Sequence, residues 1–403
     1  MTTRIRSRLV GGCLLAIVAV VGANLVAQHN PAGQGAPKSV AAENLLVVHE
    51  WGTFTSIAGR DGVALEWRPL NGSTDLPKFV HTIQSEEKGI RHGISKDNLV
   101  ARIRMETPVL YFYSASETDV SVKVDFPKGK ITEWYPQARS VSAGIDWGKL
   151  KVMPGAALTF PVESAESHYY PARETDAAPL QVCGTRGRPN QEEKFLFYRG
   201  VGSFDLPLSV KLEDDQVVLK NTGTDEITNL IIFENHGGKI GYRLCDHFTG
   251  EMRHERPVLD QSLDSLLEDL KGILVSAGLY EKEALAMIKT WRNDWFGEGT
   301  RVFYLLPRPT TDSVLPITID PRPQELVRVL VGRAEVITPE MEKGVAQKIG
   351  LLSDPSPGVR ETAMREIRKY GRFSEPILKR LLEQERDARV RGLIKKLIET
   401  QPA

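Results

Sequence analysis

The chain has 403 residues, of which 41% are hydrophobic and 26% charged, and its 52 basic residues balance its 52 acidic residues. This composition is sufficient for ordinary hydrophobic cores in two or three domains, and it excludes a largely disordered protein. No long basic run occurs, so the sequence lacks the electrostatic footprint of a nucleic-acid-binding protein, and we expect no nucleic-acid partner.

Residues 1–27 are typical of an export signal. Three arginines precede the apolar stretch "LLAIVAVV" (14–21), and the small residues "VGA" (21–23) form a cleavage site. An uncleaved membrane anchor is the alternative, because the apolar run over residues 9–27 is just long enough to span a bilayer. Residues 28–44 are then a flexible linker. We therefore expect a periplasmic or extracellular protein that contacts the membrane only through this N-terminal segment.

Removal of residues 1–27 leaves two cysteines, Cys183 and Cys245. An even pair of cysteines in an exported chain suggests a disulfide. The alternative is two buried free thiols, because the sequence does not say whether the two residues lie within bonding distance.

Residues 45–205 are expected to form a first β-rich domain. The stretches 99–116, 120–136 and 193–204 are rich in β-branched and aromatic residues and are separated by turn residues, which is typical of antiparallel sheets. A second segment, 206–338, begins with alternating strands over 207–247, with turns at "EDD" and "NTGTDE". These strands resemble those of immunoglobulin-like β-sandwich domains. That resemblance implies a fold and no activity.

Between residues 260 and 296 the hydrophobic period changes from two to about 3.6, which predicts an inserted helical pair. The strand-like stretches "TRVFYLLPR" and "ELVRVLVGRAEVI" then close the β-rich body. From residue 339 to 403 the sequence predicts a small helical module. Val359-Arg360 recurs as Val390-Arg391, and this end of the chain resembles HEAT repeats. It is either a helical cap on the body or a docking surface for another protein.

The fold class that follows is mainly β with α: an antiparallel, immunoglobulin-like β-sandwich body with an inserted helical pair and a C-terminal HEAT-like module. The body starts at "VVHEWGTFTSIAGRDG" (47–62). Strand alternation there places His49 and Trp51 on one face and Glu50 on the other. We expect Trp51 in the core, His49 in a hydrogen bond, and Glu50 on a solvated face, so that this motif begins the fold and carries no reaction.

Five of the six tryptophans directly follow an acidic residue. Paired carboxylates beside aromatic rings are the machinery of glycan hydrolysis, and the candidate acids are Glu50, Glu133 and Asp146. However, neighbours in a strand point to opposite faces. The simpler interpretation therefore has each tryptophan inward and each acid outward.

The histidines do not show the spacing of a helical metal site. His236, His247 and His254 are weak candidates for a metal site near Cys245, but isolated histidines in β-rich proteins usually form local hydrogen bonds. The motifs of serine hydrolases, phosphate-binding loops and dinucleotide-binding folds are absent. We expect no metal and no cofactor.

Six strings, "HEWGTFTS", "RMETPVLYFYS", "ITEWYP", "ARETDAAPL", "EKFLFYRG" and "GTRVFYLLPR", together resemble an uncharacterised family of exported bacterial proteins that carry an HEWGTFTS motif. The resemblance covers residues 45–337 and leaves out the helical end. It implies export from a bacterium and assigns no catalytic residue.

Two functions remain open at this point. The first is an exported binding or scaffolding protein of the cell envelope, whose partner is a glycan or another envelope protein docked on the C-terminal helices. The alternative is a secreted hydrolase that cleaves glycans through Glu50, Glu133 and Asp146. Two carboxyl groups facing each other across a cleft at about 5 to 9.5 Å would favour the hydrolase.

Overall fold

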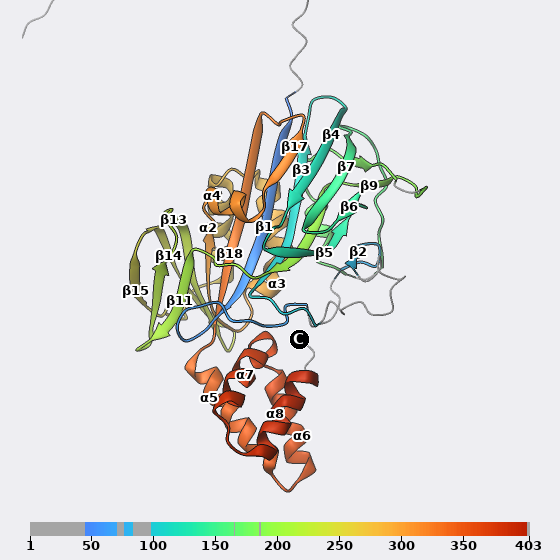
Figure 1. The fold of residues 1–403 in the computed structure, drawn as a ribbon. Helices are drawn as coiled ribbons and strands as arrows, with labels where there is room; N and C mark the ends of the chain where they lie inside the picture. The colour runs from blue at the N-terminus through green and yellow to red at the C-terminus, as the bar shows by residue number, and fades with distance from the viewer. Residues whose placement is uncertain (1–44, 71–75, 84–97, 165, 185–186, 401–403) are drawn as a thin grey trace, which may run out of the picture. The chain divides into compact units, whose positions relative to one another are not determined.

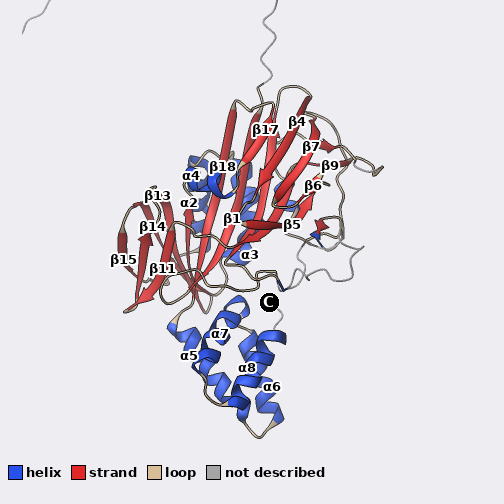
Figure 2. Ribbon diagram, viewed as in Figure 1, coloured by secondary structure: helices blue, strands red, loops and turns tan. Residues whose placement is uncertain are grey.

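The computed structural model describes residues 45–70, 76–83, 98–164, 166–184 and 187–400. The predicted signal and linker lie outside these residues. Half of the described strands belong to one nine-stranded sheet (Figures 1 and 2). In spatial order its strands are β14 (Lys239–Phe248), β13 (Ile227–His236), β16 (Gly299–Leu305), β18 (Glu325–Val336), β1 (Val47–Ala58), β3 (Ile103–Tyr113), β10 (Leu196–Gly202), β5 (Gly129–Tyr135) and β2 (His81–Thr82).

Two smaller sheets pack on one face of this large sheet. One contains β17 (Ile317–Asp320), β4 (Thr118–Asp125), β7 (Gly144–Val152), β8 (Leu180–Val182) and β9 (Gln191–Glu193), with β6 (Ser140–Val141) beside β7. The other contains β11 (Leu208–Glu213), β12 (Gln216–Asn221) and β15 (Glu251–Glu255). A single apolar cluster joins the three sheets and includes Phe54, Phe112 and Trp147.

Helices cover the opposite face of the nine-stranded sheet (Figure 2). The short helix η2 (Tyr170–Arg173) and the predicted pair, α2 (Leu263–Ser276) and α3 (Glu281–Trp295), pack there on a second apolar cluster that contains Trp51. Ser262 begins α2 by accepting a hydrogen bond from the Ser265 amide. The helix α4 (Arg308–Val314) contacts β18 from the other side, where Val314 belongs to the apolar cluster between the sheets. Trp51 is fully buried, as predicted.

The C-terminal helices are α5 (Pro339–Gly350), α6 (Pro357–Arg368), α7 (Ser374–Gln384) and α8 (Ala388–Thr400), with the short helices η3 (Leu351–Ser353) and η4 (Gly371–Phe373) between them. We call this part the helical end. Its apolar cluster includes Ile57 at the end of β1, Trp67 and Ile337. Arg60 pairs with Glu342 of α5, and Arg68 donates to Glu375 of α7 at 3.1 Å. The helical end and the strands therefore share one core.

The protein is thus a mixed α/β structure with several β-sheets and C-terminal helices. The sheets are not purely antiparallel, because β1 runs parallel to β18 while the other named strand pairs in the described residues are antiparallel. Strands from both predicted segments, 45–205 and 206–338, share the nine-stranded sheet. No helix in the part of the chain that the structure describes is long and apolar enough to cross a membrane.

Gly52, in the middle of the opening motif, lies close to the backbone of β3. A Cβ atom at this position would stand 2.9 Å from the Pro108 Cα and 3.0 Å from the Leu330 Cδ1. Because the first of these atoms belongs to the backbone, a side chain cannot be accommodated by a rotamer change alone.

We expect Gly52→Ala to lower the free energy of unfolding by about 1 to 3 kcal/mol through overpacking, as measured by denaturant unfolding. Gly272→Ala is the matched control, because no atom lies within 4 Å of a Cβ added at that position in the middle of α2. The control should stabilise the protein by about 0.5 to 1 kcal/mol. A neutral Gly52→Ala variant would contradict the close approach.

Candidate functional site

His49 fixes helix α3 against the nine-stranded sheet. Its Nδ1 lies 2.8 Å from the Glu283 carboxylate, and the same carboxylate accepts hydrogen bonds from the Tyr113 hydroxyl at 2.7 Å and the Tyr280 amide at 2.8 Å. Tyr280 is the residue that begins α3, so Glu283 caps the helix while it binds the strand. The predicted hydrogen bond of His49 is confirmed.

Glu50 is completely buried on the opposite face of β1, so the prediction of a solvated Glu50 is wrong. Arg328 on the neighbouring strand β18 donates to its carboxylate at 2.5 Å, and the Tyr198 hydroxyl donates to the other oxygen. Burial and the nearby Glu50 charge raise the pKa of Tyr198 well above its ordinary value, which keeps this hydroxyl a donor. The face that was expected to meet solvent is covered by the smaller sheets.

Three adjacent strand pairings change register at the same level of the large sheet. The shifts fall between Trp51 and Thr53 in β1 against β3, between Phe197 and Gly200 in β10 against β3, and between Arg199 and Gly200 in β10 against β5. On β3 the same level is occupied by Thr107, whose φ of +48° is rare for a threonine. Aligned bulges of this kind re-aim side chains and accumulate near functional sites.

Buried polar groups lie at this level on the face covered by α3. The hydroxyls of Thr53 and Thr107 are buried and have no hydrogen-bond partner among the described residues. Arg199 Nη2 lies 2.9 Å from His168 Nε2, and the His168 ring lies against the Trp291 ring at a centroid distance of 5.2 Å. Because arginine can only donate, His168 accepts through Nε2 and is neutral in this contact.

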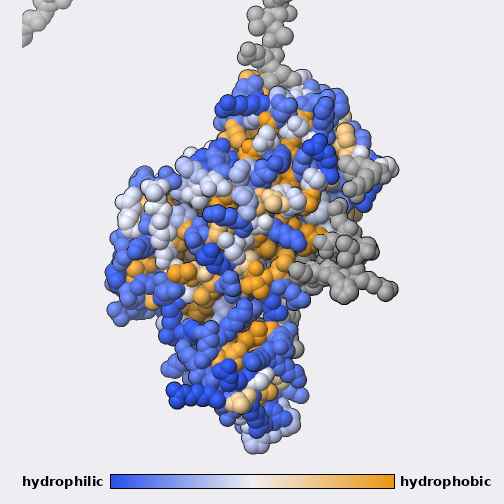
Figure 3. Space-filling model, viewed as in Figure 1, coloured by the Kyte–Doolittle hydropathy of each residue, from blue (hydrophilic) through white to orange (hydrophobic). Residues whose placement is uncertain are grey.

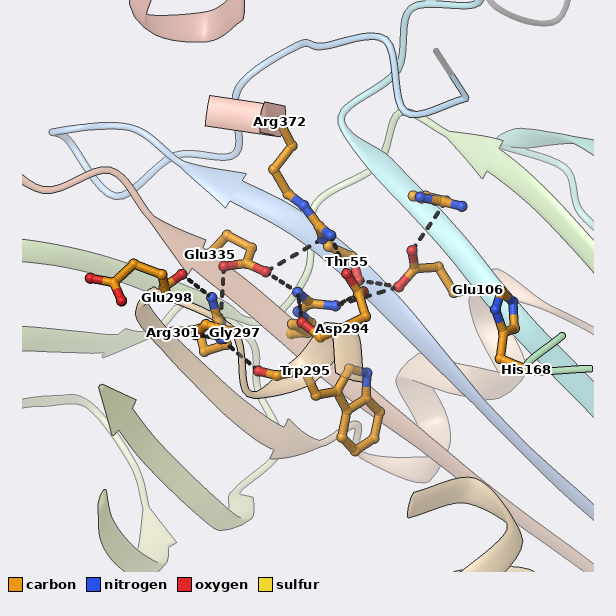
Figure 4. A network of polar contacts seen from close by, with 12 residues as sticks. Thr55, Glu106, His168, Asp294, Trp295, Gly297, Glu298, Arg301, Glu335 and Arg372 are labelled. Atoms are coloured by element: carbon orange, nitrogen blue, oxygen red, sulfur yellow. Dashed lines mark hydrogen bonds and ion pairs between the residues drawn. The ribbon is translucent and has the colours of Figure 1, made fainter. Parts of the chain in front are cut away.

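A network of buried charges continues from this level toward the end of the sheet (Figure 4). Glu106, next to Thr107, accepts a hydrogen bond from Thr55 at 2.8 Å and pairs with Arg104 at 3.1 Å. It also lies 3.9 Å from Arg333 of β18. Glu106 of β3 is therefore linked to β1 by a hydrogen bond and to β18 by charge.

Asp294, at the C-terminal end of α3, binds two arginines from different parts of the chain. Arg333 donates to one carboxylate oxygen, and also to the Asp294 carbonyl at 3.0 Å. Arg372 of η4 donates to the other carboxylate oxygen. Asp294 thereby joins the sheet, the helix and the helical end.

Glu335 completes the network on β18. Arg301 of β16 donates to it at 3.0 Å, Arg333 donates to the second oxygen, and Arg372 lies 3.4 Å from that oxygen. The remaining Arg301 donors bind the carbonyls of Trp295, Gly297 and Glu298 at 2.6 to 2.8 Å (Figure 4). The Trp295 carbonyl belongs to the last turn of α3, so Arg301 places its positive charge at the negative end of the α3 dipole.

The positive charges of the network keep Glu335 and Asp294 ionised. Burial would raise the pKa of Glu335, but Arg301, Arg333 and Arg372 lower it below its ordinary value. Burial likewise opposes ionisation of Asp294, yet Arg333 and Arg372 hold its pKa well below the usual range. Carboxylates held in this way have no proton to give up near neutral pH and are unsuited to general-acid chemistry.

A cleft of about 910 Å³ opens over this network. One wall contains the turn after β13, near His236, and the segment after α3 around Glu298, and the other contains Lys369, Tyr370 and Phe373 of the helical end. Asp294, Arg301, Arg333, Glu335 and Arg372 line it as well. On the face seen in Figure 3, hydrophobic patches are interspersed with hydrophilic residues on both the β-rich body and the helical end.

The structure does not bring the three candidate acids together. Glu50 is on β1 with Arg328, Glu133 is on β5 with a hydrogen bond from Thr132, and Asp146 is on β7 of the six-stranded sheet. Asp146 pairs with Arg139 and accepts the Gly148 amide at 2.7 Å. All six tryptophans are buried, as predicted, but the prediction of outward acids fails for Glu50 and Glu133.

The weak metal candidates are also dispersed. His236 is exposed and lies 3.1 Å from Glu298, whereas His247 is exposed and lies 3.5 Å from Glu226. His254 lies beside Cys245. In the described residues no three side chains of the His, Cys, Asp and Glu types converge on a metal position.

The predicted disulfide is wrong for this structure, in which both cysteines are free. Cys183 follows β8 in the six-stranded sheet, whereas Cys245 lies on β14 at the edge of the nine-stranded sheet. Burial raises the pKa of the Cys245 thiol and lowers the pKa of His254, so the two form a neutral contact rather than a thiolate and an imidazolium.

Sequence reasoning missed the arginines of the network. Arg301 and Arg333 occur inside the apolar strands "GTRVFYL" and "ELVRVLVGRAEV". A charge inside an otherwise apolar, buried strand must find a partner, and that pattern was the available signal. It could not identify the partners, because Asp294 lies on a helix and Arg372 lies in the helical end.

No protein-family model matches the chain, and no curated protein matches it. Among solved structures, one match is "Yeast delta-COP-I mu-homology domain complexed with Dsl1 WxWxV peptide". The identity is 8%, the match covers 74% of this chain and 98% of that chain, and the TM-score is 0.26. A similarity of this size has no bearing on the fold or activity of the chain.

Proposed function

We propose that the protein is an exported binding protein of the bacterial cell envelope, and that its ligand or partner occupies the cleft above the charged network. The cleft is the observation that carries this proposal. Its volume falls within the range of about 300 to 1,000 Å³ typical of ligand sites. Its walls come from segments far apart in the sequence and offer charges of both signs beside Tyr370 and Phe373.

The environment of the acids favours binding over hydrolysis. A glycosidase needs one carboxyl group with a raised pKa and a second one facing it. The cleft acids with resolved shifts, Asp294, Glu335, Glu340 and Glu366, all have lowered pKa values. For Asp294 and Glu335 the cause is the arginines that surround them. Glu50 and Asp146 lie in different sheets, and each of them is paired with an arginine.

We also infer that the helical end is HEAT-like and that the β-rich body is sandwich-like. Helix α5 contacts α6 and α7 contacts α8, and the small residue Ala363 is buried between helices. This is the arrangement of paired, stacked helices in which such repeats present a binding surface. The helical end would then supply one wall of the partner site.

Photo-crosslinking in cells that express the full chain tests this proposal. A crosslinking amino acid replaces Lys369, which is exposed and lines the cleft, or Lys343, an exposed lysine of α5 outside the cleft lining. We expect one discrete crosslinked species from position 369 and none from position 343. Equal crosslinking from both positions would contradict the assignment to the cleft.

A parallel assay tests the alternative, a secreted hydrolase. The purified chain is incubated with isolated peptidoglycan and with soluble envelope polysaccharides, and the release of new reducing ends is measured. We expect no release. Release that disappears in Glu133→Gln or Asp146→Asn would replace the binding proposal with the glycan hydrolase.

A further inference from the structure

Three soft donor atoms converge where β14 and β15 face each other. His254 Nε2 lies 3.4 Å from Cys245 Sγ and 2.6 Å from Met252 Sδ. All three side chains are half-buried, and Cys245 and Met252 pack at the margin of the apolar cluster between the sheets. The site is separate from the cleft, because none of the three residues lines it.

The local chain geometry accounts for this convergence. Met252 and His254 are two positions apart on β15 and therefore share a face. β15 pairs with β12 through Leu219 and Val217, and its inward face is turned toward Cys245 on β14. A short turn through Gly250, whose φ is +74°, connects the two strands. The spacing Cys-x₆-Met-x-His thus delivers all three donors from ten consecutive residues.

We propose that Cys245, Met252 and His254 bind one Cu(I) ion. A thiol, a thioether and an imidazole form a soft donor set, and soft sulfur ligands favour Cu(I), Zn²⁺ and iron–sulfur clusters over hard cations. On binding, a copper–sulfur bond replaces the S–H bond of Cys245, and the released proton goes to solvent. The copper remains in the +1 state, so no oxidant or reductant takes part.

The distances agree with this assignment. Ligand bonds of about 2.3 Å to sulfur and 2.0 Å to nitrogen, at a near-tetrahedral angle, separate the two donors by about 3.5 Å. The Cys245 Sγ to His254 Nε2 distance is 3.4 Å. Met252 Sδ is closer to the imidazole than two ligands of one ion would be. Rotation about the flexible methionine side chain provides the missing space.

The surroundings argue against a divalent ion. Zn²⁺ in a structural site takes four nitrogen or sulfur ligands, and the next histidine, His247, is exposed and directed to Glu226. Arg243 is near enough to act on both Cys245 and His254 by its charge. A positive neighbour of this kind opposes a dication more than a monocation.

A competition titration tests the site. The full-length mature chain is reduced, kept under anaerobic conditions, and titrated with Cu(I) against a chromogenic Cu(I) chelator. We expect one ion per chain. Cys245→Ser should weaken binding by about 100-fold or more, and Met252→Leu, which keeps the apolar packing, by about 10-fold. Cys183→Ser is the matched control and should bind Cu(I) like the wild type.

Each outcome of these experiments either supports the copper site or overturns it. X-ray absorption of the loaded protein should show both sulfur and nitrogen bound to copper, and the nitrogen should disappear in His254→Gln. Unchanged affinity in both Cys245→Ser and Met252→Leu would overturn the proposal, as would loss of binding in Cys183→Ser. Tighter binding of Zn²⁺ than of Cu(I) would also overturn it. Met252→Leu keeps the test valid if Cys245→Ser fails to fold.

Discussion

Glu335→Gln should lower the free energy of unfolding by about 3 to 5 kcal/mol, because it leaves buried arginines without their shared carboxylate. Glu335 is completely buried and bonds to Arg301 and Arg333, with Arg372 nearby. Denaturant unfolding at pH 7 measures the loss. Glu298→Gln is the control, because Glu298 lines the same cleft but is more than half exposed, and we expect a change within about 0.5 kcal/mol.

The effect of Glu335→Gln should depend on pH with a defined sign. The pKa of Glu335 is lower in the folded protein than its ordinary value. Its ionised form therefore contributes stability above the unfolded pKa of about 4.3, and this contribution is lost as the pH falls through the folded pKa. The difference between wild type and variant should be largest near neutral pH and should shrink in acid. A difference that grows in acid would contradict the charged network.

Glu50→Gln should also be strongly destabilising, by about 3 to 5 kcal/mol, because the buried Arg328 loses its buried charged partner and keeps only the half-exposed Asp312. Asp146→Asn is the matched comparison among the candidate acids. Its partner Arg139 is two-thirds exposed, so we expect a change below about 1 kcal/mol. Similar losses in the two variants would contradict the difference in burial.

A double variant tests whether the loss of stability in Glu50→Gln comes from the broken ion pair with Arg328 or from a general packing defect. Replacing both partners of a buried ion pair by uncharged side chains of similar volume is often close to neutral. Glu50→Gln combined with Arg328→Met should therefore recover much of the stability that Glu50→Gln loses. Losses that simply add would show that the two charges are not coupled.

The sequence pattern correctly predicted which residues of β1 lie on opposite faces, but it did not predict what covers each face. Alternation correctly placed Trp51 and Glu50 on opposite faces, and Trp51 is in the core. The pattern assumed that the face of Glu50 meets water, whereas a second layer of sheets covers it. Nothing local marks Glu50 as buried, since its partner Arg328 is 278 residues away.

The candidate site could be predicted from the sequence even less well than the surroundings of β1. The spacing of apolar residues correctly predicted the helices around 260–296 and after residue 339. It gave no indication that Asp294, at the end of one helix, would meet Arg372 from another region through paired charges. Hydrophobic periodicity identifies the elements, but ion pairs between distant elements depend on how those elements meet.

The place of β1 in the sheet affects how the chain reaches its folded state. β1 is the first described strand and β18 the last, and their parallel pairing is the only link in the described sheet between the four strands on one side and the strands on the other. Closing that contact requires nearly the whole described chain, so the two halves of the nine-stranded sheet can join only after β18 has been synthesised. Until then β1 has no partner on one side, and a sheet completed this late suits passage across a membrane as an extended chain if the protein is exported as we propose.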